Sequence, residues 1–367
     1  AFYAPGMKGI SPQERVLLEK HHPHLSKTEG GTFFHSDLHT CYHISRATKE
    51  KAVVIGLSGL NTEQLMTPRD TQRLNDNGIT LIWMTLPRPH VGRPFMQNFE
   101  KLSRAFLTSP SSPVFGLPSN DVPFFLAAHS TGGTILLKLM QEQDTRRKLS
   151  AAFLGAAYVA PFLDVPFASD EHSFKIASFR PLYWLFEKYA DKHSNERVID
   201  LPIVKKYLKL MKKGRDFLNT PTDSCPTLGQ IREIQAYSRA MRKTFDPKAA
   251  GALRSVFMAG ASDPFTCFKT TKSFVEKIPG ANFEPAYGAG HDPIYDRPEL
   301  LQKFIDHLNG CTDAYEQRRG KRVALHLNPA LPHETSDDAL KTSGLRDRAR
   351  LALQRRAGAL DAFARFF

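Results

Sequence analysis

Hydrophobic and polar positions divide the chain into short apolar runs and longer stretches with helical spacing. The length and the aromatic and β-branched content of the apolar runs predict strands, most of them buried on both faces. The predicted strands lie within "GTFFH" (31–35), "CYHIS" (41–45), "KAVVIGLSGLN" (51–61), "GITLIWMTLP" (78–87), "VPFFLAA" (122–128), "AAFLGAAYVAP" (151–161), "RSVFMAG" (254–260) and "ANFEPAYGAGH" (281–291). Helix-compatible stretches such as 62–77 separate several of these runs. This order predicts an α/β fold with a mostly parallel central sheet flanked by helices.

Two segments interrupt the alternation. Residues 162–246 contain no convincing buried strand but many aromatic and basic residues, and they directly follow a predicted strand. Such an insertion is typical of a helical cap over a site. Residues 311–367 follow the last sheet element and end in a separate helical pattern. We therefore expect an irregular segment 1–30, a core of 31–161 and 247–310, a helical cap 162–246 and a basic C-terminal extension 311–367.

The predicted strand at 122–128 stops abruptly at "HSTGG" (129–133), and apolar residues then resume at helical spacing. This pattern places Ser130 on a sharp turn between a strand and a helix. Such a turn exposes the serine hydroxyl and requires small residues two positions before and after it, which here are Ala128 and Gly132. The N–H groups at the start of the helix suit a developing negative charge. Without partner groups, however, the pattern is equally a glycine-containing turn with an incidental serine.

Partners for the serine follow two later strands. Asp263 comes after "SVFMA" (255–259), and His291 lies in the loop "YGAGHDP" (287–293). Taken alone, Asp263 could cap a turn before a proline and His291 could be a surface residue. Together with Ser130 they occur in the order nucleophile, acid and base, which is the order expected of an α/β-hydrolase. We therefore predict Ser130, Asp263 and His291 as a catalytic triad.

Three other polar residues are weaker candidates. Asp164 also follows a strand and is the alternative acid. His129 adjoins Ser130, but a neighbouring residue on such a turn is expected to point away from the serine hydroxyl. His307 lies within the predicted last helix and is expected to be too far along it to reach the strand ends.

An oxyanion hole for this chemistry needs two N–H donors. One is the residue after the nucleophile, Thr131, and the other belongs to the loop after the third core strand. That loop reads "SGLN" (58–61), so we predict the backbone N–H of Leu60, with Gly59 allowing a close approach. The predicted chemistry requires neither a metal nor an organic cofactor.

These motifs resemble those of α/β-hydrolases of the bacterial lysophospholipase and monoacylglycerol lipase type. The resemblance covers roughly residues 31–310. It implies the α/β-hydrolase fold, a serine nucleophile and an acyl-lipid substrate. The chain departs from the family pattern at Ser58-Gly59, where members commonly have His-Gly, and at "TLPRPHVGRP" (85–94), where they tend to carry an Asp-x-Arg-Gly-like loop.

Composition restricts the possible partners. The chain has 367 residues, 41% of them hydrophobic, and a formal net charge of +13. This charge favours anionic partners, but no nucleic-acid-binding motif accompanies it, which disfavours nucleic acid. No apolar run approaches the ~18 residues of a membrane-spanning helix. The four cysteines contain no Cys-x-x-Cys pair, so neither a zinc site nor a disulfide framework is predicted, and a reducing cytoplasmic location is favoured.

Three segments bear on the substrate. Residues 178–189 ("SFRPLYWLFEKY") are aromatic-rich and fit either an acyl-chain pocket or the interior of the cap. Residues 201–217 form a basic amphipathic pattern that fits either an anionic membrane surface or a cap helix with solvated lysines. Residues 344–367 are similar, and docking onto the domain, a partner or a lipid surface all remain open.

These expectations combine into one predicted activity. The chain is expected to be a serine hydrolase that cleaves a carboxylic ester of a single-chain lipid, a lysophospholipid or a monoacylglycerol, through an acyl-enzyme on Ser130. Peripheral contact with an anionic membrane surface would accompany this activity. An acyltransferase that passes the acyl group to an acceptor other than water, and a soluble carboxylesterase, are the alternatives.

Overall fold

The computed structural model describes residues 29–60, 68–85, 94–109, 112, 122–149, 153–164, 227–251, 254–263, 266–297 and 299–319. Their centre is an eight-stranded sheet in the order β1-β2-β4-β3-β5-β6-β7-β8. The strands are β1 (Glu29–His35), β2 (Leu38–Ser45), β3 (Ala52–Leu57), β4 (Ile79–Met84), β5 (Phe124–His129), β6 (Phe153–Val159), β7 (Arg254–Gly260) and β8 (Asn282–Ala286). The pairs β1–β2 and β2–β4 are antiparallel, and every other pair is parallel. The predicted mostly parallel sheet is therefore confirmed.

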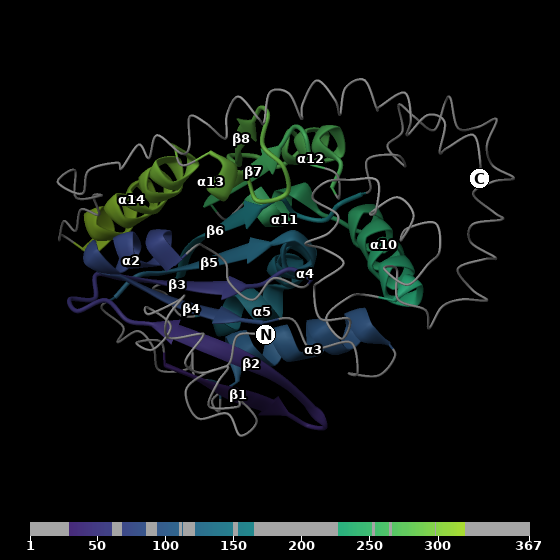
Figure 1. Cartoon of the computed structure of the whole chain (residues 1–367), viewed down its shortest axis with the longest axis horizontal. Helices are drawn as coiled ribbons and strands as arrows, with labels where there is room; N and C mark the ends of the chain where they lie inside the picture. The colour runs from purple at the N-terminus through teal and green to yellow at the C-terminus, as the bar shows by residue number, and fades with distance from the viewer. Residues whose placement is uncertain are drawn as a thin grey trace, which may run out of the picture.

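Helices cover both faces of this sheet (Figure 1). They are α2 (Pro68–Asp76), α3 (Phe95–Thr108), α4 (Ser130–Gln141), α5 (Gln143–Lys148), α10 (Leu228–Lys243), α11 (Pro247–Gly251), α12 (Phe268–Val275), α13 (Pro293–Asp296) and α14 (Glu299–Arg319). Helices α2 and α14 lie together on one side of the sheet, whereas α3, α4 and α10 lie on the other.

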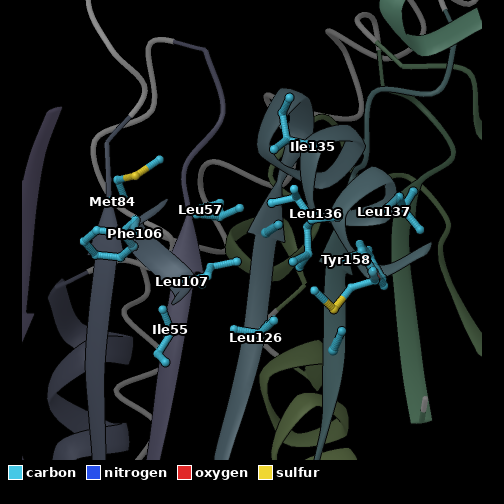
Figure 2. Close-up of a cluster of buried hydrophobic side chains, with 14 of the residues drawn as sticks. Ile55, Leu57, Met84, Phe106, Leu107, Leu126, Ile135, Leu136, Leu137 and Tyr158 are labelled. Atoms are coloured by element: carbon cyan, nitrogen blue, oxygen red, sulfur yellow. The ribbon is translucent and has the colours of Figure 1, made fainter. Parts of the chain in front are cut away.

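Two hydrophobic clusters explain why the central strands read as unbroken apolar runs. Along β3, Val53, Ile55 and Leu57 face the cluster under α3 and α4, whereas Ala52 and Val54 face the cluster under α2 and α14. Because both faces are buried, both sets of alternating positions must be apolar. Figure 2 shows part of the first cluster, to which α4 contributes Ile135 and Leu136 and the strands contribute Leu57 and Leu126.

The carboxyl ends of β3, β5, β6, β7 and β8 lie along one edge of the sheet, because these strands are parallel neighbours. The segments that begin with Ser58, Ser130, Ala160 and Ala261 all leave the sheet at this edge. In α/β sheets, ligand sites form beyond the carboxyl ends of the strands. The fold therefore places the predicted site residues where a site can form.

Several predicted features lie outside the described residues. These are most of 1–30 and 86–93, the aromatic segment 178–189, the basic segment 201–217 and the C-terminal segment 344–367. The division of the chain at 162, 246 and 310 stays a prediction. Helix α14 (Glu299–Arg319) is continuous across position 310. No helix within the described residues has the length and apolar content needed to cross a membrane.

Candidate active site

Ser130 occupies the turn between β5 and α4. His129 closes the strand with extended backbone angles, and Ser130 then adopts a φ of 50°, in the left-handed region that residues other than glycine seldom enter. Such a conformation costs about 1–3 kcal/mol and persists only where surrounding contacts enforce it. The side chain of Ser130 is nearly buried, with 5% relative exposure. The strained turn is the local geometry that the sequence predicted.

Close backbone contacts hold this turn in place. A Cβ added to Gly132 would lie 2.5 Å from the carbonyl oxygen of Leu57 and 2.6 Å from that of Ser58. Because both atoms are backbone atoms that cannot rotate away, α4 can approach the end of β3 only with glycine at this position. Gly133 is similarly close to Pro161, whose Cβ would be 2.9 Å from an added Cβ.

The turn after β6 supports the same helix start. The N–H of Phe162 donates to the carbonyl oxygen of Ser130 at 2.9 Å, and the hydroxyl of Thr134 donates to the carbonyl oxygen of Phe162 at 2.5 Å. Ser238 of α10 donates to the same carbonyl oxygen at 3.0 Å. The Ser130 backbone is therefore fixed by elements from three parts of the chain.

Asp263 and His291 are in direct contact. The Nδ1 atom of His291 lies 2.8 Å from Oδ2 of Asp263, although the residues are 28 positions apart in sequence. The Asp263 side chain is fully buried, and that of His291 is 18% exposed. A carboxylate only accepts hydrogen bonds, so Nδ1 carries a hydrogen and Nε2 is the ring atom with the lone pair when the imidazole holds one proton.

Thr266 fixes the orientation of the Asp263 carboxylate. Its backbone N–H donates to Oδ1 at 3.0 Å, and its hydroxyl donates to Oδ2 at 2.5 Å. The carboxylate thus caps a local turn and also binds the imidazole of His291. The structure thus contains the turn contact that the sequence allowed, and the role of Asp263 as the catalytic acid stays a prediction.

The loop after β3 lies against Ser130. A Cβ added to Gly59 would be 2.7 Å from Cβ of Ser130, so the chain passes the serine as closely as glycine permits. Ser58 anchors the loop by donating its N–H to the carbonyl oxygen of Met84 at 3.0 Å. Leu60 follows directly, and Thr131 lies in the first turn of α4, where N–H groups lack partners within the helix.

The weaker candidates are located elsewhere or are otherwise engaged. Asp164 binds Arg242 of α10 at 2.9 Å, and it is Asp263 that contacts His291. His307 faces Cys311 at 3.8 Å on α14, and Cys311 in turn lies beside Gly155 at the opposite end of β6. Within the described residues, no group of three or more His, Cys, Asp and Glu side chains could hold a metal ion.

Asp292 is a site residue that sequence reasoning missed. Its Oδ1 atom lies 3.2 Å from Nε2 of His129. That hydrogen bond with His129 is the main reason why the pKa of the Asp292 carboxyl lies below its usual range. Its position directly after His291 was the only available signal, and a spacing of one residue in a loop does not predict a contact with another strand.

Comparisons with known proteins concern the fold. No family model matches the sequence. No curated protein matches it either. Among solved structures, a soluble variant of monoglyceride lipase from Saccharomyces cerevisiae is similar with a TM-score of 0.53 and 15% identity, over 76% of this chain and 94% of that chain.

Two further solved structures agree with this similarity. A thermostable carboxyl esterase from Bacillus coagulans has a TM-score of 0.54 and 13% identity, over 77% of this chain and 98% of that chain. An α/β-hydrolase from a Penicillium species has a TM-score of 0.52 and 13% identity, over 77% of this chain and 98% of that chain. Together with the eight-stranded sheet, the strained turn at Ser130 and the helices on both faces, these similarities show that the chain has the α/β-hydrolase fold.

Proposed function

We propose that this protein is a serine hydrolase in which Ser130, Asp263 and His291 act as nucleophile, acid and base. The observation that carries the proposal is the buried contact between Asp263 and His291, at the same edge of the sheet as the strained Ser130 turn. A buried carboxylate on Nδ1 directs the lone pair of the imidazole to Nε2, which is the atom required to accept a serine proton.

The proposed reaction proceeds in two halves. The Oγ atom of Ser130 attacks the ester carbonyl carbon while Nε2 of His291 takes its proton. The N–H groups of Leu60 and Thr131 donate to the resulting oxyanion. The intermediate then collapses, His291 returns the proton to the departing alcohol, and an acyl-enzyme remains on Ser130. Water, deprotonated by His291, cleaves that ester and releases the fatty acid.

The proposed substrate is a lipid with a single acyl chain, either a monoacylglycerol or a lysophospholipid. The fold-level similarity to a monoglyceride lipase and a carboxyl esterase supports an ester substrate. The net charge of +13 supports action at an anionic membrane surface by a cytoplasmic protein. Each basic residue near such a surface contributes about 1 kcal/mol, and salt screens this attraction.

A hydrolysis screen tests the substrate class. The wild-type protein is incubated with 1-oleoylglycerol, palmitoyl-lysophosphatidylcholine and p-nitrophenyl esters of two to sixteen carbons, with Ser130→Ala as the control. We expect long-chain lipids to be cleaved at rates at least comparable with those of short esters, and the Ser130→Ala protein to be inactive. Cleavage of short esters alone would contradict the lipid assignment. Acyl transfer to added glycerol in place of hydrolysis would instead identify an acyltransferase.

A further inference from the structure

The imidazole of His129 connects the serine turn to the histidine loop. Its Nε2 atom lies 3.1 Å from the carbonyl oxygen of His291 and 3.2 Å from Oδ1 of Asp292. The rings of His129 and His291 are 4.7 Å apart between their centroids. His129 is 3% exposed and the Asp292 side chain is 64% exposed, so a buried imidazole meets a carboxylate at the surface. The residue that directly precedes Ser130 therefore contacts the backbone of His291.

The partners of His129 determine which of its ring nitrogens donates a hydrogen bond. Both groups facing Nε2 are acceptors, so Nε2 carries the proton and shares it between the carbonyl oxygen and the carboxylate. The hydrogen bond with His129 lowers the pKa of Asp292, which keeps this carboxylate negative at neutral pH. One N–H on Nε2 of His129 is therefore placed to donate to both the carbonyl oxygen of His291 and the Asp292 carboxylate.

The loop that carries His291 is also held from its other side. The Nδ1 atom of His291 binds Asp263, and the N–H of Gly290 donates to Oδ2 of Asp296 at 2.6 Å. The carbonyl oxygen of Gly290 packs against Gly260 so closely that an added Cβ there would lie 2.0 Å from it. The contacts with Gly260 and Asp263 tie the loop to the end of β7, the contact with Asp296 ties it to α13, and His129 ties it to the end of β5.

We propose that His129 and Asp292 form a positioning pair that sets the base His291 relative to the nucleophile Ser130. This proposal rests on the proposed function, because it concerns the geometry of the same reaction. One side chain, attached one residue before the nucleophile, binds the carbonyl group of the base itself. Movement of either loop therefore breaks this bond, and a displacement of about 1 Å can cost a hundredfold in rate.

The pair also places negative charge near the imidazole of His291. Among the described residues, the ionisable groups near this ring include the carboxylate of Asp263 at its Nδ1 atom, Asp292, whose pKa is lowered by both histidines, and the imidazole of His129. Asp296 faces the adjacent backbone N–H of Gly290. When His291 takes the serine proton it becomes positive, and the Asp292 carboxylate stabilises that state.

Four variants separate positioning from general structural support. His129→Leu removes the donor, and His129→Gln keeps an N–H group on a side chain of similar reach. Asp292→Asn keeps the acceptor but removes the charge from a side chain that is 64% exposed, so folding should be unaffected. Asp144→Asn makes the same change at a carboxylate that is 77% exposed on α5. The values of kcat and KM for p-nitrophenyl butyrate are measured from pH 5 to pH 9.

We expect His129→Leu to lower kcat about tenfold or more with KM changed less than twofold, and His129→Gln to recover part of the loss. Asp292→Asn should move the acidic limb of the kcat/KM profile to lower pH by roughly half a unit, because the ring becomes harder to protonate without the carboxylate. Asp144→Asn should leave the profile in place. Should His129→Leu fail to fold, the Gln and Asn variants still decide the result.

Two outcomes distinguish a failure of the positioning pair from a failure of the proposed function. Suppose that wild-type protein hydrolyses the ester at Ser130, but that kcat and the acidic limb of the kcat/KM profile are unchanged in the His129 and Asp292 variants. The positioning pair is then wrong and the proposed function stands. If wild-type protein has no Ser130-dependent hydrolysis, the proposed function fails, and the pair has no base to position.

Discussion

Asp263 illustrates what a single residue reveals before and after folding. From sequence it was both a turn former and a candidate acid, and local context could not decide between them. In the structure the carboxylate accepts hydrogen bonds from Thr266 and also contacts the imidazole of His291. The position of Asp263 after a buried strand made it predictable that its carboxylate lies at this end of the sheet. The second hydrogen bond from Thr266 was not, because it depends on a hydroxyl rotamer.

The contacts of His129 with Asp292 and the carbonyl oxygen of His291 could not be predicted from the individual residues. The expectation that His129 points away from the serine hydroxyl is a statement about one turn. It does not say which distant loop the side chain meets. That contact joins residues 162 positions apart through a backbone carbonyl, which carries no sequence signature.

His43 gives a prediction on pH and stability. Burial lowers its pKa to about 4, and its ring stacks on Trp83 at 5.5 Å. In the unfolded chain His43 has the ordinary histidine pKa of 6.5. Between pH 6.5 and pH 4, His43 is therefore protonated more fully in the unfolded state than in the folded state. Stability should therefore fall as the pH drops through this window. The contribution from His43 is roughly 2 kcal/mol between pH 7 and pH 4.5.

Urea unfolding of wild type and His43→Phe at pH 7 and pH 4.5 checks this contribution. The phenylalanine keeps an aromatic ring against Trp83 but cannot titrate, so the variant should lose less stability on acidification. His39→Gln removes an exposed imidazole from the same strand and controls for the loss of a histidine. An equal loss for wild type and His43→Phe would show that His43 is not the responsible group.

At the scale of elements, the junction of β5 and α4 depends on Gly132. We predict that Gly132→Ala lowers the free energy of unfolding by about 1–3 kcal/mol, because the methyl group must displace backbone atoms. The displaced atoms belong to the end of β3 and the loop that follows it. The rate of ester hydrolysis should therefore fall at least about tenfold, as expected when the loop shifts.

Gly310→Ala is the matched control, since an added Cβ there meets nothing within 4 Å and the residue lies within α14. Alanine should leave hydrolysis unchanged and slightly raise stability, given its higher helix propensity. Urea unfolding and hydrolysis rates measure both variants. A Gly132→Ala protein with wild-type stability and rate would contradict the crowded geometry of the turn.

Elements differed in how well their patterns predicted them. The buried strands were predictable because short unbroken apolar runs are typical of strands that are covered on both faces. Helix α3 was not singled out, although Phe95, Phe99, Leu102 and Phe106 recur at helical spacing. Its position depends on distant groups: Glu233 of α10 accepts from the N–H of Met96 at 2.6 Å, and Tyr237 donates to Glu100 at 2.5 Å. Contacts of this range cannot be inferred from one sequence.

For the whole molecule, the sheet order explains why Ser130, Asp263 and His291, which are distant in sequence, all lie at one edge of the sheet. Parallel neighbours β3, β5, β6, β7 and β8 bring the loop after Leu57 and the loop after Ala286 to one edge, although they are distant in sequence. The α/β class and this edge could be predicted, because alternating strands and helices leave few topologies. The antiparallel β1–β2 hairpin at one end of the sheet could not be placed from pattern alone.

The central claim is that Ser130 is an activated nucleophile, and covalent labelling tests it most directly. Purified protein is treated with a fluorophosphonate probe, digested and analysed by mass spectrometry. We predict stoichiometric modification at Ser130, no modification of Ser130→Ala, and labelling slowed at least about a hundredfold in His291→Ala, which lacks the base. A wild-type protein that folds but is not labelled, or is labelled equally well without Ser130, would contradict the account.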